Sequence, residues 1–328
     1  MRYTTLGPFA QVSRLTLGGG GLGQIWGETT PEEVHAAIHG SIDAGINLID
    51  TAPSYLHCER EVSKAFGGTL PSGVRITTKC LLGTVPEGSA AIMLEASIDA
   101  SLSAMKIDHA DLFFLHSNIC EDDFIFAHGD EFRAQFATPW SQYTNEVIPC
   151  FESLKAKGKI GAWGITGIGV PSTILRALTH SVRPDVVQLI ANLMDSAGAL
   201  RRYEEPERAR ELIAAAKASG VGVMGIRAVQ AGALTAAIDR PLKPSHPEAK
   251  DFARATPFRA LCDNLAIDPA IMAHRYALDI LGVDTVVLGI KNQAELHQCL
   301  EAEALGPIPD DLRGLIDNLG LATGRTGS

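Results

Sequence analysis

The sequence predicts an α/β protein with the (β/α)8 barrel (TIM barrel) fold, as a single domain spanning residues 1–328. Eight short apolar segments, each suited to a strand covered on both faces, alternate with segments of helical periodicity. The chain of 328 residues has the length of one such barrel. Polar side chains stand where several of these strands end, as at the mouth of a barrel enzyme. The competing fold, a doubly wound sheet, usually has fewer strands and a separate substrate domain at this length.

The elements of the repeat follow one another along the chain. The strands are predicted at residues 15–17, 47–50, 75–79, 111–116, 160–166, 186–190, 222–226 and 285–288. The best-marked helix begins with Thr30, Pro31 and Glu33, a capping box with proline at the first helical position, and Gly45 ends it. Apolar spacing predicts further helices near residues 94–105, 147–157, 206–219 and 268–281.

Three segments lie outside the repeat. Residues 3–6 and 11–13 flank a Gly-Pro-Phe turn and predict an N-terminal β-hairpin that is able to plug the bottom of the barrel. A long loop at residues 117–146 follows the fourth strand, and its aromatic residues predict that it folds over the barrel mouth. A second long segment, residues 227–250, follows the seventh strand.

Composition excludes several classes of protein. The formal net charge is −10 and no run of Lys and Arg could follow a phosphate backbone, so we expect no nucleic-acid partner. No stretch approaches about 18 consecutive apolar residues, and the first residues lack the apolar core of a signal peptide. We therefore expect a cytoplasmic protein without a membrane partner. The six cysteines are scattered without a CxxC pair, which predicts reduced thiols.

One glycine pattern requires interpretation. Gly18, Gly20 and Gly23 match the spacing GxGxxG, which brings a backbone close to a dinucleotide pyrophosphate when a helix opens at the last glycine. Here the next predicted helix begins only at Pro31. We interpret the segment as a flexible turn at the mouth, with the close approach of a ligand as the alternative.

Polar residues at the strand ends are the more informative signal. In a barrel these ends converge on one face. Taken singly, each residue has an ordinary structural explanation. Taken together they indicate a functional site, because an apolar strand that ends in Lys or His buries a costly group without an obvious structural return. The strand-end candidates are the polar residues Asp50, Lys79, His116, Thr166 and Gln188, together with Gly289.

The segment from Gly45 to Tyr55, GINLIDTAPSY, with Glu59 beyond it, resembles the signature of the aldo-keto reductase superfamily. The likeness continues at residues 76–79, 111–116 and 154–160 and so extends over nearly the whole chain. The resemblance implies an oxidoreductase whose catalytic residues are Asp50, Tyr55, Lys79 and His116. It also implies a nicotinamide cofactor bound in an extended pose across the mouth, without a Rossmann domain.

These four residue types suit carbonyl reduction, which needs a hydride at carbon and a proton at oxygen. Tyr55 would exchange the proton as general acid or base, and Lys79 would lower the pKa of its phenol. Asp50 would keep Lys79 charged and aim it. A neutral His116 would donate a hydrogen bond to the substrate carbonyl.

The predicted contacts with the nicotinamide depart in part from the family pattern. Thr166 stands where most members carry a Ser-Asn pair that holds the carboxamide, and this run resembles the sugar dehydrogenase branch. Gln188 matches the other carboxamide contact. Ile226 replaces the Tyr that stacks on the ring in many members. Arg227 follows strand seven, where it suits either the pyrophosphate or an ordinary surface position.

The segment after strand eight resembles the family's grip on the adenosine end of the cofactor. It begins at Gly289, and Lys291 and Asn292 stand where they would contact a 2′-phosphate, which favours NADP. Glu295 would repel a phosphate and accept a hydrogen bond from a free ribose, which favours NAD. We predict NADP, with NAD as the alternative.

The predicted function is therefore hydride transfer between NADP(H) or NAD(H) and an aldehyde, ketone or sugar. Trp26 and Trp140 predict a partly aromatic substrate pocket, which suits sugars and apolar aldehydes alike. A nucleotide-sensing subunit without significant turnover is the alternative. A metal-dependent hydrolase is less favoured, because His116 is the only histidine predicted at a strand end and such sites use several.

Overall fold

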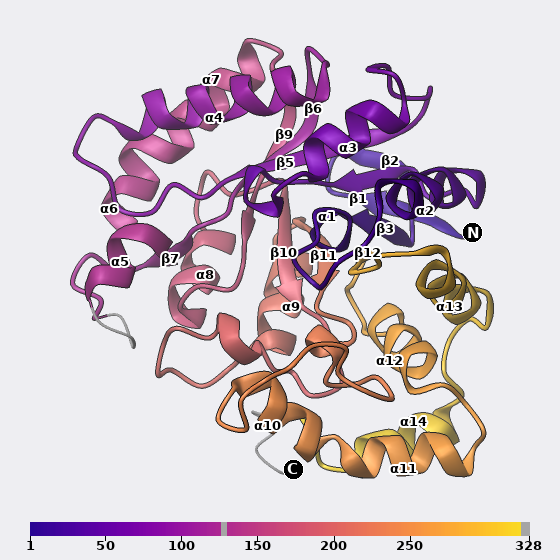
Figure 1. Cartoon of the computed structure of the whole chain (residues 1–328). Coiled ribbons are helices and arrows are strands. Elements are labelled where there is room, and N and C mark those ends of the chain that lie inside the picture. The colour runs from indigo at the N-terminus through magenta and orange to yellow at the C-terminus, as the bar shows by residue number, and fades with distance from the viewer. Residues whose placement is uncertain (126–129, 323–328) are drawn as a thin grey trace.

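Eight parallel strands close into a barrel in the computed structural model of the chain, which describes residues 1–125 and 130–322 (Figure 1). They pair in chain order, and the last pairs with the first. The strands are β3 (Leu15–Gly18), β4 (Leu48–Asp50), β5 (Arg75–Cys80), β6 (Ala110–Leu115), β9 (Ile160–Thr166), β10 (Val186–Ile190), β11 (Gly222–Ile226) and β12 (Thr285–Leu288). The predicted (β/α)8 barrel is confirmed.

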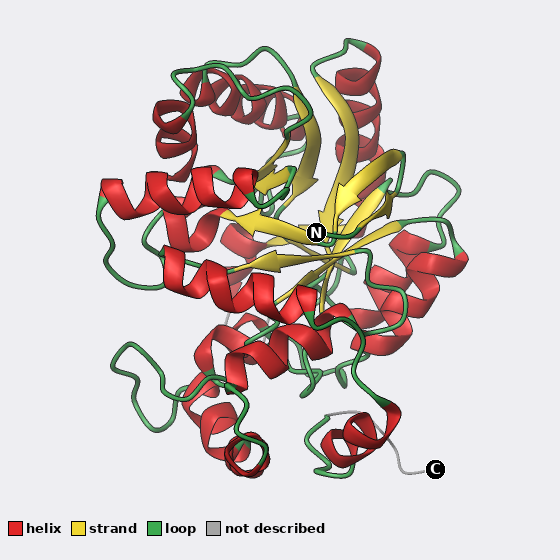
Figure 2. Cartoon of the chain, turned by 90° about the vertical axis from the view of Figure 1, so that its right-hand side faces the viewer, coloured by secondary structure: helices red, strands yellow, loops and turns green. Residues whose placement is uncertain are grey.

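Helices surround the barrel wall (Figure 2). Those that follow the strands are α2 (Pro31–Asp43), α3 (Cys58–Ala65), α4 (Ala90–Met105), α7 (Ile148–Ala156), α8 (Pro171–Leu178), α9 (Ala209–Ala218), α12 (Pro269–Leu278) and α13 (Gln293–Ala304). Shorter or additional helices are α1 (Gly19–Leu22), α5 (Asp130–Phe136), α6 (Trp140–Gln142), α10 (Pro247–Arg254), α11 (Thr256–Asn264) and α14 (Asp310–Asp317). The predicted capping box of α2 is present, since Thr30 Oγ1 accepts from Glu33 N at 3.2 Å.

The N-terminal hairpin closes one end of the barrel. Its strands β1 (Tyr3–Leu6) and β2 (Phe9–Ser13) are antiparallel. Leu6 and Val12 are buried in one cluster with barrel residues that include Leu48 and Val186, each the first residue of its strand. The hairpin therefore packs against the N-terminal ends of the strands, as the sequence predicted, and leaves the C-terminal ends as the mouth.

The long loop after β6 has structure of its own. Its strands β7 (Asn118–Cys120) and β8 (Ala137–Pro139) pair in parallel. Thr138 Oγ1 donates to Gly83 O after β5 at 2.8 Å, and Val170 N after β9 donates to Ile119 O at 3.3 Å. The loop thus lies along the β5, β6 and β9 side of the mouth. Phe126, one of its aromatic residues, lies outside the described residues.

All six cysteines are buried and free. Within the described ranges, no helix has the length and apolar character needed to cross a membrane.

Candidate active site

A buried ion pair stands at the C-terminal ends of β4 and β5. Lys79 Nζ donates to Asp50 Oδ2 at 2.7 Å and to Thr51 O at 2.8 Å. The two side chains are 0% and 2% exposed, so neither charge has access to bulk solvent. Burial alone would lower the pKa of Lys79, but the carboxylate of Asp50 and the phenol of Tyr55 together hold it above its ordinary value. The site therefore keeps a permanent cation inside an apolar barrel.

Tyr55 lies close to the ammonium of Lys79. It ends a short 3-10 helix, Pro53–Tyr55, in the loop after β4. Lys79 Nζ lies 4.5 Å from the centroid of its ring. Burial raises the pKa of the phenol and outweighs the lowering by Lys79, so the pKa stands above its usual value. Lys79 itself lowers the pKa of the phenol, as expected from the sequence, but the loss of hydration on burial raises that pKa by more.

His116 faces Tyr55 from the end of β6. The two rings meet edge to face with their centroids 5.7 Å apart, and Ser54 Oγ lies 3.3 Å from His116 Nδ1. Burial, together with the nearby charge of Lys79, lowers the pKa of His116 to about 3. The imidazole is therefore neutral at physiological pH, as the sequence interpretation requires. The structure thus brings all four predicted catalytic residues together.

Thr166 and Gln188 lie side by side on the opposite wall, paired in register between β9 and β10. Gln188 Nε2 donates to Asp50 Oδ1 at 2.7 Å. Among the described residues, the buried Thr166 Oγ1 finds no hydrogen-bond partner. An orphaned hydroxyl at a strand end fits a contact with a polar group of a bound ligand, and the nicotinamide carboxamide is such a group.

The residues predicted at the adenosine end gather at the start of α13. Asn292 caps this helix, its Oδ1 accepting from Glu295 N at 3.0 Å, and Glu295 Oε2 accepts from Lys291 N at 2.7 Å. The ammonium of Lys291 binds Asp239 and lies 3.5 Å from Glu295 Oε1. Burial works against the charge of Lys291, but the two carboxylates raise its pKa above the ordinary value. Gly289 is exposed just before this cluster.

Arg227 and Ile226 end β11. The Arg227 guanidinium is 8% exposed and donates to Glu248 Oε1 at 2.6 Å and to Gln230 Oε1 at 2.9 Å. These contacts tie the start of the segment 227–250 to α10. Ile226 is half-buried against a cluster that contains Ile190.

The two predicted pocket tryptophans lie in different surroundings. Trp26 stands at the mouth: its carbonyl is 3.5 Å from Lys291 Nζ, and Arg240 lies 5.7 Å from its ring. Trp140 packs on the flank, with the Arg176 guanidinium of α8 3.9 Å above its ring and His180 beside it. Trp26 thus adjoins the predicted cofactor segment, whereas the rings beside Trp140 are those of Tyr143 and His180, away from that segment.

The glycine run after β3 forms one helical turn, α1, instead of a flexible turn. A Cβ on Gly21 would lie 2.0 Å from Ile290 O, and one on Gly23 would lie 1.8 Å from Tyr55 O. Because these glycines have no side chain, α1 packs closely between the loop after β12 and the loop that carries Tyr55. Close backbone packing explains two positions of the GxGxxG spacing, Gly23 and Gly18, since a Cβ on Gly18 would lie 2.0 Å from Leu288 O.

Sequence reasoning missed three polar partners. Thr77 Oγ1 donates to Asp50 Oδ1 at 2.7 Å, and strand alternation places it on the same face as Lys79, so the period of two was an available signal. Asp239 and Glu248 lie in segments without periodicity, and no sequence signal pointed to their pairing with Lys291 and Arg227.

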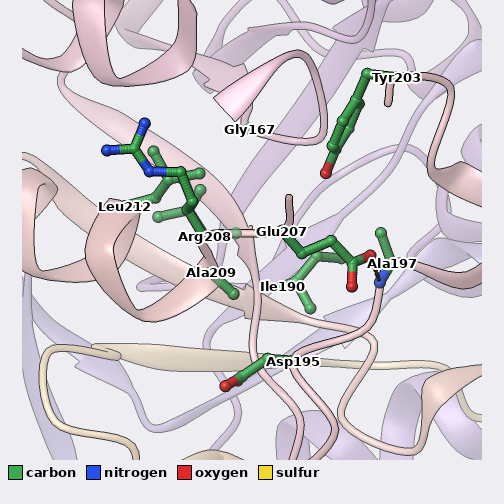
Figure 3. Close-up of a pocket in the computed structure, with 10 residues that line it drawn as sticks. Gly167, Ile190, Asp195, Ala197, Tyr203, Glu207, Arg208, Ala209 and Leu212 are labelled. Atoms are coloured by element: carbon green, nitrogen blue, oxygen red, sulfur yellow. Dashed lines mark hydrogen bonds between the residues drawn. The ribbon is translucent and has the colours of Figure 1, made fainter. Parts of the chain in front are cut away.

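A small crevice lies outside this site, between α9 and the loops after β9 and β10 (Figure 3). Gly167, Tyr203 and Leu212 are among its lining residues, and Ala197 N donates to Glu207 Oε1 at 2.8 Å across it. Its lining does not include the four catalytic candidates. Within the described residues, no cluster of His, Cys, Asp or Glu could hold a metal ion.

A phenol, a neutral imidazole and a buried ammonium at the mouth of a (β/α)8 barrel define an enzyme site suited to interconverting carbonyls and alcohols. A model of the Aldo/keto reductase family matches residues 14–320, and the chain belongs to this family. It is an NAD(P)-dependent oxidoreductase of carbonyl compounds.

Two curated relatives are similar over most of their length. L-galactose dehydrogenase of Arabidopsis thaliana is 26% identical over 306 residues, covering 90% of this chain and 87% of the relative. D-threo-aldose 1-dehydrogenase of a Pseudomonas species is 25% identical over 326 residues, covering 90% of each.

Solved structures show the same fold. The holo form of the aldo-keto reductase AKR11C1 from Bacillus halodurans matches with a TM-score of 0.70 at 20% identity, covering 97% of this chain and 96% of that one. The glycerol dehydrogenase AKR11B4 from Gluconobacter oxydans matches with a TM-score of 0.68 at 21% identity, covering 95% and 93%.

Proposed function

We propose that this chain oxidises an aldose at C1 to the lactone, with Tyr55 as the group that accepts the hydroxyl proton. The observation that carries the proposal is the buried ammonium of Lys79, 4.5 Å from the Tyr55 ring and anchored on Asp50. The sugar class is supported by the two curated relatives, both of which are named as sugar dehydrogenases. Reduction of aldehydes or ketones is the reverse use of the same groups.

Each of the four residues has a separate task in this proposal. When bound, the nicotinamide ring accepts or supplies the hydride at the substrate carbon. Tyr55 holds or releases the proton at the substrate oxygen, and Lys79 stabilises the phenolate that oxidation requires. Neutral His116 donates a hydrogen bond to the same oxygen and orients it. Asp50 keeps Lys79 charged and fixed in the barrel.

The cofactor contacts follow from the same geometry. Thr166 would hold the carboxamide, since its buried hydroxyl lacks a protein partner among the described residues. Ile226 would pack on the nicotinamide ring, and Gly289 would let the chain approach the adenosine end. We propose no direct contact for Arg227, because Glu248 and Gln230 already bind its guanidinium.

For cofactor choice, the contacts of Lys291 favour NAD over the NADP that the sequence predicted. Its ammonium already binds Asp239 and lies beside Glu295, and Asn292 is committed to capping α13. The carboxylates of Asp239 and Glu295 already neutralise Lys291, and Arg240, 3.5 Å from Asp239, brings the formal charge of the four groups to zero, so a 2′-phosphate finds no net attraction here. The same carboxylates can accept hydrogen bonds from a free ribose diol.

The cofactor proposal is tested by kcat/KM for NAD+ and NADP+ in the parent, in Glu295→Gln and in Asp239→Asn. We expect the parent to prefer NAD+ and each variant to move toward NADP+, by about tenfold for each 1.4 kcal/mol of repulsion removed. A parent that prefers NADP+ tenfold would show that Lys291 exchanges Asp239 for the phosphate.

The proposed role of Tyr55 is tested by Tyr55→Phe, which removes only the hydroxyl. Turnover of L-galactose and of D-threo-aldoses should fall by about 100-fold or more, with cofactor affinity nearly unchanged. Tyr143→Phe is the control for loss of a tyrosine hydroxyl, because Tyr143 is fully buried and belongs to the π-helical turn Tyr143–Val147. Near-normal turnover in Tyr55→Phe would remove Tyr55 from the mechanism.

The same assay separates the enzyme from a nucleotide-sensing subunit, which would bind cofactor with little multiple turnover. A small-molecule carbonyl or sugar is the partner that this proposal requires. A cytoplasmic location is supported by the six unpaired thiols, which are typical of reducing compartments.

A further inference from the structure

The carboxylate of Asp50 receives three hydrogen bonds of equal length inside the barrel. Lys79 Nζ donates to Oδ2, whereas Thr77 Oγ1 and Gln188 Nε2 both donate to Oδ1, each at 2.7 Å. All four side chains belong to residues that are at most 2% exposed. One oxygen is thus reserved for Lys79 and the other is saturated by neutral donors.

These two neutral donors reach Asp50 from different sides of the barrel. Thr77 is the register partner of Asp50 on the adjacent strand β5, and its side chain points inward like that of Lys79. Gln188 belongs to β10, which is separated from β4 by β11, β12 and β3 in the closed sheet, so its side chain spans the interior. Rotation of the carboxylate would break at least one of the two bonds.

We propose that Thr77 and Gln188 are positioning residues, which fix the Asp50 carboxylate so that Lys79 stays over Tyr55. The inference rests on the proposed acid–base role of Tyr55. In this proposal Gln188 Nε2 acts on proton transfer by fixing Asp50. Only Gln188 Oε1 is then left for the cofactor contact that the sequence predicts.

The consequence of losing these donors has a definite sign. Hydrogen bonds to Oδ1 draw negative charge away from Oδ2, so without them Asp50 offsets more of the positive field of Lys79. The phenolate of Tyr55 would then be less stabilised, and the phenol would ionise at higher pH. Oxidation requires the phenolate, so its rate at a fixed pH would fall. The titratable groups around Tyr55 are Lys79, Asp50, Cys58 and His116.

Thr77→Val tests the inference, because it removes the hydroxyl and nearly keeps the shape. Thr77→Ser should restore the hydrogen bond. Thr16→Val is the matched control, since the Thr16 hydroxyl is also fully buried in the barrel but bonds to Thr285 Oγ1, at 2.8 Å, and not to Asp50. Thermal unfolding of all three variants shows whether the barrel is intact.

Two readouts distinguish positioning from a structural role. The first is the ionisation of Tyr55, measured as the ultraviolet tyrosinate difference between each variant and the same variant carrying Tyr55→Phe. The second is the pH dependence of kcat for aldose oxidation. We expect Thr77→Val to move both midpoints to higher pH and to lower kcat at pH 8 by about tenfold, with Thr77→Ser and Thr16→Val close to the parent.

Gln188→Leu tests the second donor in the same way. If it acts through Asp50, the Tyr55 midpoint of the cofactor-free enzyme rises and kcat at saturating cofactor falls, while the dissociation constant of the cofactor reports separately on the loss of Oε1. A raised dissociation constant with an unchanged Tyr55 midpoint would overturn the positioning role of Gln188.

Unchanged Tyr55 ionisation in a folded Thr77→Val variant would overturn the inference for Thr77, and so would an equal shift in Thr16→Val. The tyrosinate titration needs no substrate, so it still decides the inference if the parent oxidises no aldose. A parent that oxidises no aldose would instead refute the proposed sugar oxidation.

Discussion

Replacing Lys79 by Met would remove the buried cation and keep most of its volume. With Lys79 Nζ 4.5 Å from the Tyr55 ring centroid, and at an effective dielectric of about 20, the ammonium stabilises a phenolate by at most about 3.7 kcal/mol. At about 1.4 kcal/mol for each tenfold, the phenol of Lys79→Met would ionise up to about 500-fold less readily. The negative charge of Asp50 offsets part of the field of Lys79, so the actual stabilisation of the phenolate is smaller than this upper bound.

The expected result is a fall of aldose oxidation at pH 8 by between about 30-fold and 500-fold, with a pH midpoint displaced upward. The variant also leaves the Asp50 charge unpaired in the interior, which costs about 3 to 5 kcal/mol of unfolding free energy. The double variant Lys79→Met with Asp50→Asn removes that charge, so stability should largely return while turnover stays low. Steady-state oxidation from pH 6 to 11 and thermal unfolding measure the two effects separately. Oxidation by Lys79→Met within tenfold of the parent would refute the electrostatic argument.

Three further outcomes follow from the described contacts. Tyr143→Phe should raise the unfolding free energy by about 1 kcal/mol, because the buried Tyr143 hydroxyl lacks a hydrogen-bond partner among the described residues; chemical denaturation would contradict this by showing a loss. The pKa of His116 near 3 predicts that carbonyl reduction shows no histidine limb between pH 5 and 8, and an acid limb near pH 6.5 that disappears in His116→Gln would disprove it. Leu56→Gly should stabilise the protein by about 1 kcal/mol, since Leu56 has φ 51° and ψ −101° and is 64% exposed; a lower melting temperature than the parent argues against strain there.

The barrel strands were predictable because each is an apolar run of the right length. Strands β9 and β10 begin and end at the predicted residues. Helices α3 and α8 were missed for different reasons. In α3 the buried positions include Glu59 and Glu61, which bind Thr78 and Lys64. Because charged residues occupy its buried face, the sequence of α3 lacks the apolar periodicity that indicates a helix. The eight residues of α8 span too little chain for a helical period to stand out.

The candidate site was predictable where strand ends fix it and unpredictable where loops complete it. Asp50, Lys79 and His116 follow from the rule that strand ends converge, and Tyr55 follows from the signature segment. The pairing of Lys291 with Asp239 joins residues 52 positions apart through a loop whose course no local pattern specifies. From the sequence, only one carboxylate, Glu295, could therefore be weighed against Lys291, whereas the structure places Asp239 beside the same ammonium.

The hairpin covers the N-terminal end of a barrel whose interior is filled by side chains, so reactants reach the catalytic candidates from the C-terminal mouth. With Leu6 and Val12 sealed against the first residues of β4 and β10, both reactants must pass through the same opening. The reactant that binds deeper must enter first, and the product formed from it must leave last. Initial-rate kinetics should therefore show a compulsory order of addition, and the last product to leave should inhibit competitively against the first reactant to bind.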